Sequence, residues 1–343
     1  MIKTPSMPAT PIPKSIATPS LLSQIITCKY QFGLPLNRQE TLFSDIGIEL
    51  SRQTMSSWML RSGELLEPLY IRLKEILLAE PAIHADETPL KVIKAKKATS
   101  YMWVYCCGTD NPGNNTNIVL FDYHNSRAAQ CPIDFLDGYQ GYMHVDGYKA
   151  YELTAAKLVA CLAHIRRKFV DAKKIQAKSR TSKADVVLNL IGKLYGIEQL
   201  IKEKSIEDKF KIRQSHAKPI VQKLHKWLTD HKDKIPPKNK LGEAITYGIN
   251  QFEKFQRYLE DGRLSIDNNR AERAIKPFVI GRKAWLFSNT CNGAHASAIL
   301  YSIVETAKAN GLVVHDYLST CLQHIAEQPN NLEPLLPWNI KRG

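Results

Sequence analysis

Cysteine pairs that could bind a metal or build a disulfide framework are missing from this sequence. The chain has seven cysteines, an odd number, and they are scattered with no CxxC pair. Such a pattern supports neither a disulfide-stabilised scaffold nor a thiolate zinc site. We therefore expect reduced thiols.

Long apolar segments are also missing. No stretch approaches the roughly 18 uninterrupted apolar residues that a membrane-spanning helix needs. The N-terminus lacks the apolar region behind basic residues that is typical of a signal peptide. We therefore expect a cytoplasmic protein with no membrane partner.

Acidic residues are in the minority. The 343 residues include 47 Lys and Arg against 33 Asp and Glu, which gives a formal net charge of +14 and a pI near 9.3. This balance favours a polyanionic partner, with nucleic acid first, although a basic enzyme of another kind is the alternative. The hydrophobic content of 44% is enough for a sizeable core.

Composition and hydrophobic period divide the chain into helical and strand-rich segments. Three β-rich runs over residues 82–122, a helix over 126–136 and two further strands predict an α/β fold with a mixed sheet. The predicted segments are a proline-rich extended arm (1–20), a helical region (21–78), the first part of the α/β core (79–163), an all-α insertion (164–262), the second part of the core (263–312), and a C-terminal helix and tail (313–343).

Two acids are placed at predicted strand ends. Asp86 lies near the end of the first predicted strand, and Asp146 ends the fourth. Open α/β sheets bind ligands at this edge. Glu272 adds a third carboxylate from the helix predicted in LSIDNNRAERAIKP. Three such acids suit Mg²⁺, and two ions can hold both oxygens of an in-line phosphoryl displacement. Taken singly, each acid also fits a turn, a cap or a solvated helix face.

Basic residues surround these acids in the sequence. Cations on the Glu272 helix, and others after the last predicted strand of the first core segment, are dense enough to contact DNA phosphates, although solvated helix faces are the alternative. The candidates are Arg166, Arg167, Lys168, Arg270, Arg273, Lys276, Arg282 and Lys283.

Cys161 and His164 form a CxxH pair after the strand KLVACL. Two ligands are too few for a structural zinc site, which takes four. A buried cysteine followed by a helix-capping histidine is another explanation of the pair. A nuclease or zinc hydrolase built on these two residues is a further alternative, and it predicts bound zinc.

The segment 36–61 is predicted to form two short helices around a turn at Gly47, with Ser51 capping the second helix. This is helix-turn-helix spacing, which also occurs in helix pairs that bind nothing. Residues of the second helix would face outward toward phosphates and base edges, namely Arg52, Gln53 and Thr54. The expected core of the pair is Leu42, Phe43, Ile46, Ile48, Leu50, Met55, Trp58 and Met59.

The stretches HADETPLKV, HVDGYKAY, CLAHIRRKF, LSIDNNRAERAIKPFVIGRKAWLFSN and LLPWN resemble the insertion-sequence-66 family of bacterial transposases. The resemblance implies an RNase H-like catalytic domain whose triad is Asp86, Asp146 and Glu272, with the helical insertion between the last two. Similar CxxH pairs follow the second Asp in several transposase families, which implies that His164 lies near the active site.

The resemblance also implies a reaction. A transposase of this kind uses Mg²⁺ or Mn²⁺, with two ions expected, to hydrolyse double-stranded DNA at transposon ends and to transfer the freed strand into target DNA. It implies a homo-oligomer, accessory proteins of the same element, and association with the nucleoid.

The chain departs from the family pattern at its start. Relatives commonly carry a longer N-terminal region, with a coiled-coil segment and a cysteine-bearing element, before the stretch SIATPSLL. A fragment, a shortened copy, or a DNA-binding protein without catalysis is therefore the alternative to an active transposase.

Overall fold

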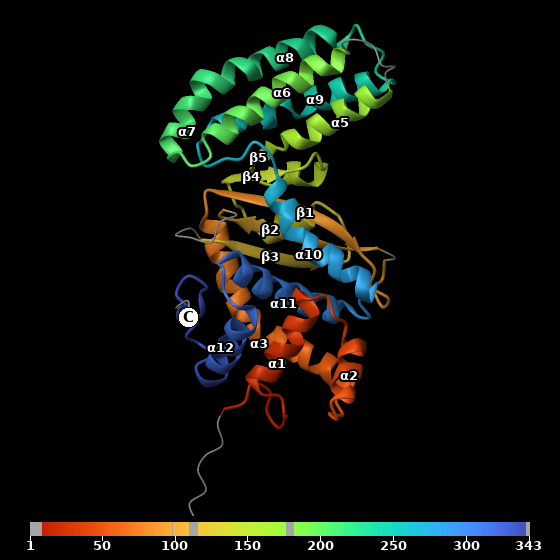
Figure 1. The fold of residues 1–343 in the computed structure, drawn as a ribbon, viewed down its shortest axis with the longest axis vertical. Coiled ribbons are helices and arrows are strands. Elements are labelled where there is room, and N and C mark those ends of the chain that lie inside the picture. The colour runs from red at the N-terminus through yellow and green to blue at the C-terminus, as the bar shows by residue number, and fades with distance from the viewer. Residues whose placement is uncertain (1–8, 98, 110–115, 176–181, 341–343) are drawn as a thin grey trace, which may run out of the picture. The chain divides into compact units, whose positions relative to one another are not determined.

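The computed structural model describes residues 9–97, 99–109, 116–175 and 182–340 (Figure 1). The chain forms two compact units, each assembled from separate stretches. The first comprises Met1–Glu80, Asp86–Phe135 and Ala271–Gly343, and the second Pro81–Ala85 and Leu136–Arg270. None of the helices in the described ranges has both the length and the apolar character needed to cross a membrane.

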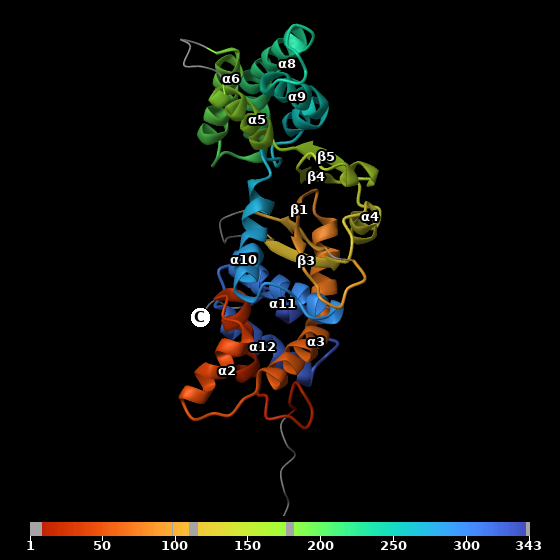
Figure 2. The ribbon, with the colours of Figure 1, turned by 90° about the vertical axis from the view of Figure 1, so that its right-hand side faces the viewer.

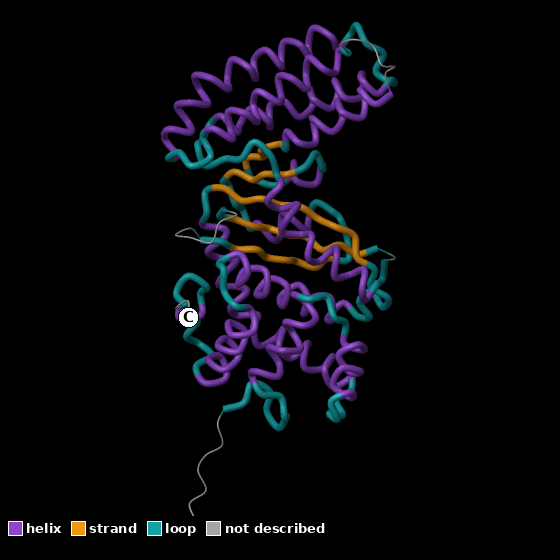
Figure 3. Tube along the Cα trace, viewed as in Figure 1, coloured by secondary structure: helices purple, strands orange, loops and turns teal. Residues whose placement is uncertain are grey.

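Five strands form one mixed sheet in the order β3-β2-β1-β4-β5 (Figure 3). β2 and β3 are antiparallel, whereas β4 is parallel to both β1 and β5. The mixed sheet and its strand sequence agree with the prediction, but the helix expected from residue 126 begins later. The bounds are β1 (Ala82–Leu90), β2 (Ser100–Cys107), β3 (Ile118–His124), α4 (Gln130–Leu136), β4 (Tyr142–Val145) and β5 (Lys157–Ala160).

The first unit is built around one buried helix, α11. Figure 1 shows it between β3 and α3, and it contacts both elements. At the α3 contact, an ideal Cβ on Gly63 would lie 2.9 Å from the Cβ of Ala296, so only glycine allows this approach. The helices of this unit are α1 (Pro19–Ile26), α2 (Leu36–Asp45), α3 (Arg52–Ala79), α10 (Asn269–Trp285, in this unit from Ala271 onward), α11 (Cys291–Ala309) and α12 (Val314–Glu327).

Polar side chains of α11 satisfy the outer edge of β3. Ser302 accepts a hydrogen bond from the backbone N–H of Phe121 at 2.7 Å, and Thr306 accepts one from Val119 at 3.0 Å. Asn310, one helical turn further, donates to a backbone carbonyl just before the strand. An edge strand otherwise presents unpaired backbone groups. The polar residues at four-residue spacing in an apolar helix are thereby explained.

The helix pair predicted over residues 36–61 is present, but its second helix is not short. Gly47 at the turn has φ +80°, and the Ser51 hydroxyl accepts from the N–H of Thr54, as predicted. α3 then continues to Ala79 through Pro68. Its buried residues recur every three to four positions along that length, which carries the helix past the predicted end.

Only part of the core expected for this helix pair is buried. The residues from the second helix, together with Leu50, are buried. On the first helix and the turn, Phe43 is half-buried and the others are exposed, with Ile46 at 65%. The buried residues contact elements outside the pair, because α3 packs against α11 and β3. The exposed members are Leu42, Ile46 and Ile48.

The second unit is a helical bundle beside β4 and β5. α5, α6, α8 and α9 run side by side in Figures 1 and 2, and neighbouring helices contact one another. They occupy most of the insertion predicted over residues 164–262. The bounds are α5 (Leu162–Ile175), α6 (Lys183–Leu200), α7 (Ile206–Ile212), α8 (Lys218–Lys232) and α9 (Lys240–Gln256).

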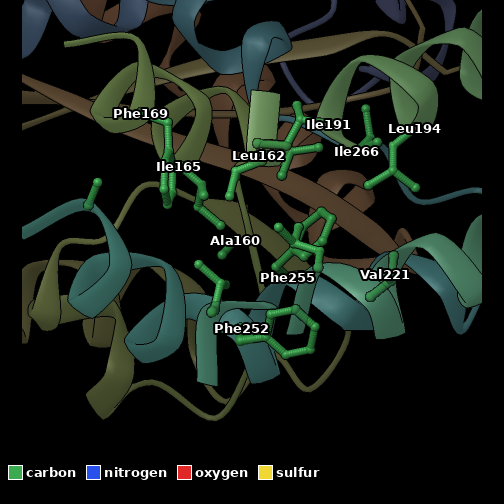
Figure 4. Packing of buried hydrophobic residues seen from close by; sticks show 14 of the residues in the cluster. Ala160, Leu162, Ile165, Phe169, Ile191, Leu194, Val221, Phe252, Phe255 and Ile266 are labelled. Carbon is green, nitrogen blue, oxygen red and sulfur yellow. The ribbon is translucent and has the colours of Figure 1, made fainter. Parts of the chain in front are cut away.

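One apolar core holds this bundle to β5. Figure 4 shows Ile165 and Phe169 of α5 with Phe252 and Phe255 of α9, and Ala160 at the end of β5 belongs to the same cluster. Removing this much apolar surface from water is the main stabilising contribution to such a bundle. The core therefore fixes α5 next to the strand that precedes it.

Candidate active site and nucleic-acid interface

The two strand acids lie at different places in their strands. Asp146 directly follows β4, as predicted, and its Oδ1 accepts the backbone N–H of Tyr148 at 2.8 Å. Asp86 is half-buried in the middle of β1, so the expectation that it stands near a strand end is wrong. β1 runs on to Leu90 because alternate residues, Thr88 and Leu90, remain buried.

A histidine precedes each acid by two residues. His84 of β1 and His144 of β4 are register partners in the parallel pair, and both rings are buried. The rings stack with centroids 4.3 Å apart and planes at 14°. Each acid is the second residue after a registered partner, Asp86 within β1 and Asp146 directly after β4. The sequence signal was available as the repeated pattern His-x-Asp, in IHADE and MHVDG.

His144 is held neutral. Its Nε2 accepts the backbone N–H of Ser265 at 3.3 Å, so that nitrogen carries no proton. Burial, followed by the influence of His84 and Arg213, lowers the pKa of His144 well below its ordinary value. The ring of His144 therefore stays uncharged where it stacks on His84.

Asn268 joins three segments of the second unit and was not singled out by the sequence. It is 1% exposed. Its Nδ2 donates to the carbonyl of Ala85 at 2.8 Å, its Oδ1 lies 3.0 Å from Nδ1 of His84, and its backbone N–H donates to Sγ of Cys161 at 3.2 Å. Two asparagines in the run IDNN were the available signal, but nothing in the sequence says that the first is the buried one.

Cys161 is buried directly after β5, and this burial raises the pKa of its thiol from 9.0 to about 11. His164 follows on the first turn of α5 and is half-buried. The CxxH pair therefore joins the end of β5 to the start of α5.

Gly147 allows the chain after Asp146 to approach α9. An ideal Cβ at Gly147 would lie 2.9 Å from the hydroxyl of Tyr247. Burial, and then the negative charge of Asp146, raise the pKa of Tyr247 to about 12. The tyrosine is therefore a neutral hydroxyl group near this acid.

Glu272 lies in the first turn of α10 and is half-buried. Of the cations predicted around it, Arg273 and Lys276 are exposed. Arg282 is instead half-buried and donates from Nη1 to the hydroxyl of Thr88 at 3.0 Å and to the carbonyl of Pro89. Burial lowers the pKa of Arg282. This contact ties α10 to β1 within the first unit.

A basic groove of about 570 Å³ lies between α5 and α6 in the second unit. Arg166 and Arg167 line it, are exposed, and have no carboxylate within ion-pairing distance in the described parts of the chain. Lys174 also lines it but is paired with Asp171 at 3.0 Å. The groove therefore presents unneutralised positive charge.

The predicted base-reading residues stand at the start of α3. Arg52, Gln53 and Thr54 are exposed, as expected for side chains able to reach a ligand. The backbone N–H of Arg52 donates to Glu40 of α2 at 2.8 Å. The two helices are thereby joined at this end.

These features define a basic mixed α/β protein with one acidic side chain within β1 and another directly after the neighbouring parallel strand β4. The chain belongs to the IS66 family of transposases: the family model described as Transposase IS66 family matches residues 14–296, and the IS66 C-terminal element matches residues 302–338. This confirms the family resemblance carried by the sequence motifs.

Similar proteins come from Sinorhizobium fredii (strain NBRC 101917 / NGR234). The uncharacterized protein y4qI is 33% identical over 97% of this chain and 65% of its own length, and the uncharacterized protein y4jD is 32% identical over 95% and 66%. The chain thus spans about 65% of the length of the curated relatives it matches. No solved structure matches the chain.

Proposed function

We propose that this protein is a DNA transposase that cleaves phosphodiester bonds at transposon ends and joins the freed strand to target DNA. The observation that carries the proposal is the pair of His-x-Asp segments on neighbouring parallel strands, with His84 opposite His144. Asp86 and Asp146 follow these partners at equal spacing. Glu272, on the first turn of α10, is the proposed third acid.

The donor set fits a hard divalent cation. Asp86, Asp146 and Glu272 are half-buried carboxylates, and oxygen donors of this kind suit Mg²⁺ or Mn²⁺. We propose that they hold two ions. When bound, the ions would supply Lewis-acid activation of the attacking oxygen and neutralise charge on the leaving oxygen.

The proposed reaction has two displacements at phosphorus. Water attacks the phosphodiester at the transposon end, the bond from phosphorus to the 3′-oxygen breaks, and a 3′-hydroxyl is left. That hydroxyl then attacks a target phosphodiester, gives up its proton, and displaces a second 3′-oxygen. The residues of this chain would orient the phosphates and provide the acidic ligands, with no nucleophilic side chain. His164, on the first turn of α5, is the proposed neighbour of the scissile phosphate.

Double-stranded DNA is the proposed partner, as transposon ends and as target. This is supported by Arg166 and Arg167 in the groove beside α6, which form no ion pair with the residues that the structure describes. Phosphate contacts dominate nucleic-acid affinity. The remaining proposed contacts follow the same chemistry, with base edges assigned to the start of α3. They are Arg52, Gln53, Thr54, Lys168, Arg270, Arg273, Lys276, Arg282 and Lys283.

The finer fold and assembly are proposals of the same kind. The five-stranded mixed sheet, followed along the chain by the helical insertion, supports an RNase H-like core. The α2–α3 pair supports a helix-turn-helix role in reading DNA. We propose a homo-oligomer when active, accessory proteins of the same element, and association with the nucleoid.

The test is Mg²⁺- and Mn²⁺-dependent cleavage and joining of labelled DNA that carries the element's own ends. Wild type is compared with Glu272→Gln and with the control Glu253→Gln, an exposed glutamate on α9 paired with Arg257. Activity lost in the first variant and kept in the second, with DNA binding intact in both, supports the proposal. Activity retained in Glu272→Gln counts against the triad. Binding without activity in wild type favours a non-catalytic DNA-binding protein.

A further inference from the structure

We propose that Asn268 is a positioning residue that fixes the backbone leading into two of the proposed metal-holding acids. It acts through β1 ahead of Asp86 and through the start of α10 ahead of Glu272. This inference rests on the proposed function and adds a residue that touches neither DNA nor metal in its role.

The orientation of the Asn268 amide is determined by its partners. The carbonyl of Ala85 can only accept, so the NH₂ group must face it, and the contact is 2.8 Å. The amide oxygen then faces Nδ1 of His84 at 3.0 Å, which requires the proton of that ring nitrogen to lie between them. These two partners thereby fix the orientation of the Asn268 amide, and the amide oxygen in turn fixes a proton on Nδ1 of His84.

The same residue is tied through its backbone. Its N–H donates to Sγ of Cys161, directly after β5, at 3.2 Å. The buried side-chain amide, with its two partners in β1, is costly to disturb, because the carbonyl of Ala85 and Nδ1 of His84 would each lose a hydrogen bond away from water. Asn268 therefore cross-links β1, the end of β5, and the loop that leads into α10.

Chain continuity carries this constraint to the acids. Ala85 is followed directly by Asp86, and Asn268 is followed directly by Asn269, the first residue of α10, with Glu272 in its first turn. A strand and the first turn of a helix have little freedom of backbone torsion. Fixing Ala85 within β1 and Asn268 directly before α10 therefore fixes the direction in which each acid leaves the backbone, and partners of this kind tune metal affinity.

The test measures Mn²⁺ affinity of the full chain by titration, read out by electron paramagnetic resonance without DNA. Asn268→Ala is expected to weaken Mn²⁺ binding by roughly 10–100-fold, the range for residues that orient metal ligands. Asn310→Ala is the matched control, because Asn310 is also buried and donates to two backbone carbonyls, of Asn117 and Thr306. It is expected to lower thermal stability comparably and to leave Mn²⁺ affinity unchanged.

Three comparisons decide the inference. If Asn268→Ala folds and binds Mn²⁺ as tightly as Asn310→Ala does, the positioning role of Asn268 is overturned. Asp86→Asn is the reference variant for the metal site. If Asp86→Asn also binds Mn²⁺ like wild type, the proposed metal function fails as well. If Asp86→Asn binds Mn²⁺ weakly while Asn268→Ala does not, only the positioning role fails. Should Asn268→Ala not fold, Asn268→Leu replaces it, since leucine has the same branched arrangement of heavy atoms without hydrogen-bonding groups, and the same outcomes apply.

Discussion

The hydroxyl oxygen of Ser302 lies 2.7 Å from the backbone nitrogen of Phe121, in the middle of the edge strand β3. It also lies 2.7 Å from the carbonyl oxygen of Ala298, one turn earlier in α11, to which it donates. The side chain thus links helix to strand. Ser302→Ala should lower the free energy of unfolding by about 1–3 kcal/mol, because the buried Phe121 N–H would lose its partner.

Urea denaturation and hydrogen exchange at the Phe121 amide would measure this effect. The control is Thr320→Ala on α12, an exposed hydroxyl that donates only to its own helix, at the carbonyl of Asp316. That change should stay within about 0.5 kcal/mol of wild type. Equal losses in the two variants would contradict a special role for the α11 hydroxyl.

Two helical glycines should respond to alanine with opposite signs. At Gly63 of α3 a new Cβ meets Ala296 of α11 at 2.9 Å, so overpacking of about 1–3 kcal/mol outweighs the gain of about 1 kcal/mol in helix propensity. At Gly196 of α6 a new Cβ meets no described atom within 4 Å outside its own stretch of helix, so only the gain in helix propensity remains. Thermal unfolding should show Gly63→Ala below wild type and Gly196→Ala above it. A rise in both would show that α3 and α11 separate at little cost.

The secondary structure was largely predictable because it depends on local patterns. Runs of β-branched and aromatic residues separated by turn residues predicted the strands, and helical period predicted the bundle. The second helix of the pair was predicted too short. The buried stripe from Met55 to Leu77 maintains α3 through Pro68 by packing on α11 and β3. Ile46 is exposed for the same reason, because the buried residues of α3 pack against α11 and β3 and not against the turn.

The candidate acids could be chosen from the sequence, but their supports could not. Asp146 is the residue after an apolar strand followed by glycine, which is a local signal. Asn268 contacts Ala85 and His84 from more than 180 positions away along the chain, and no local pattern specifies such a partner. The repeated His-x-Asp was visible, although its meaning depends on the register that places His84 opposite His144.

Cys161 predicts a pH dependence of stability. Its pKa is raised from 9.0 to about 11 in the folded protein, so the folded state favours the protonated thiol. The stabilising contribution is therefore complete below pH 9 and is lost as the pH rises through about 11. The difference in unfolding free energy between wild type and Cys161→Ala should shrink over this interval by about 2–3 kcal/mol. Cys291→Ala, at a partly exposed cysteine, is the control, and a constant difference for Cys161→Ala would contradict the shift.

The groove beside α5 predicts how salt affects DNA binding. Arg166 and Arg167 are exposed and have no carboxylate partner within residues 9–97, 99–109, 116–175 and 182–340, so both are available to neutralise phosphates. Each phosphate contact contributes close to one unit to the slope of log affinity against log salt on double-stranded DNA. The double variant Arg166→Ala, Arg167→Ala should therefore bind more weakly and lower the slope by about two. Lys211→Ala is the control, since this exposed lysine on α7 is already paired with Glu207 at 2.6 Å. Fluorescence anisotropy across a salt series measures both quantities, and an unchanged slope in the double variant would remove the groove from the DNA-binding surface even if the affinity fell.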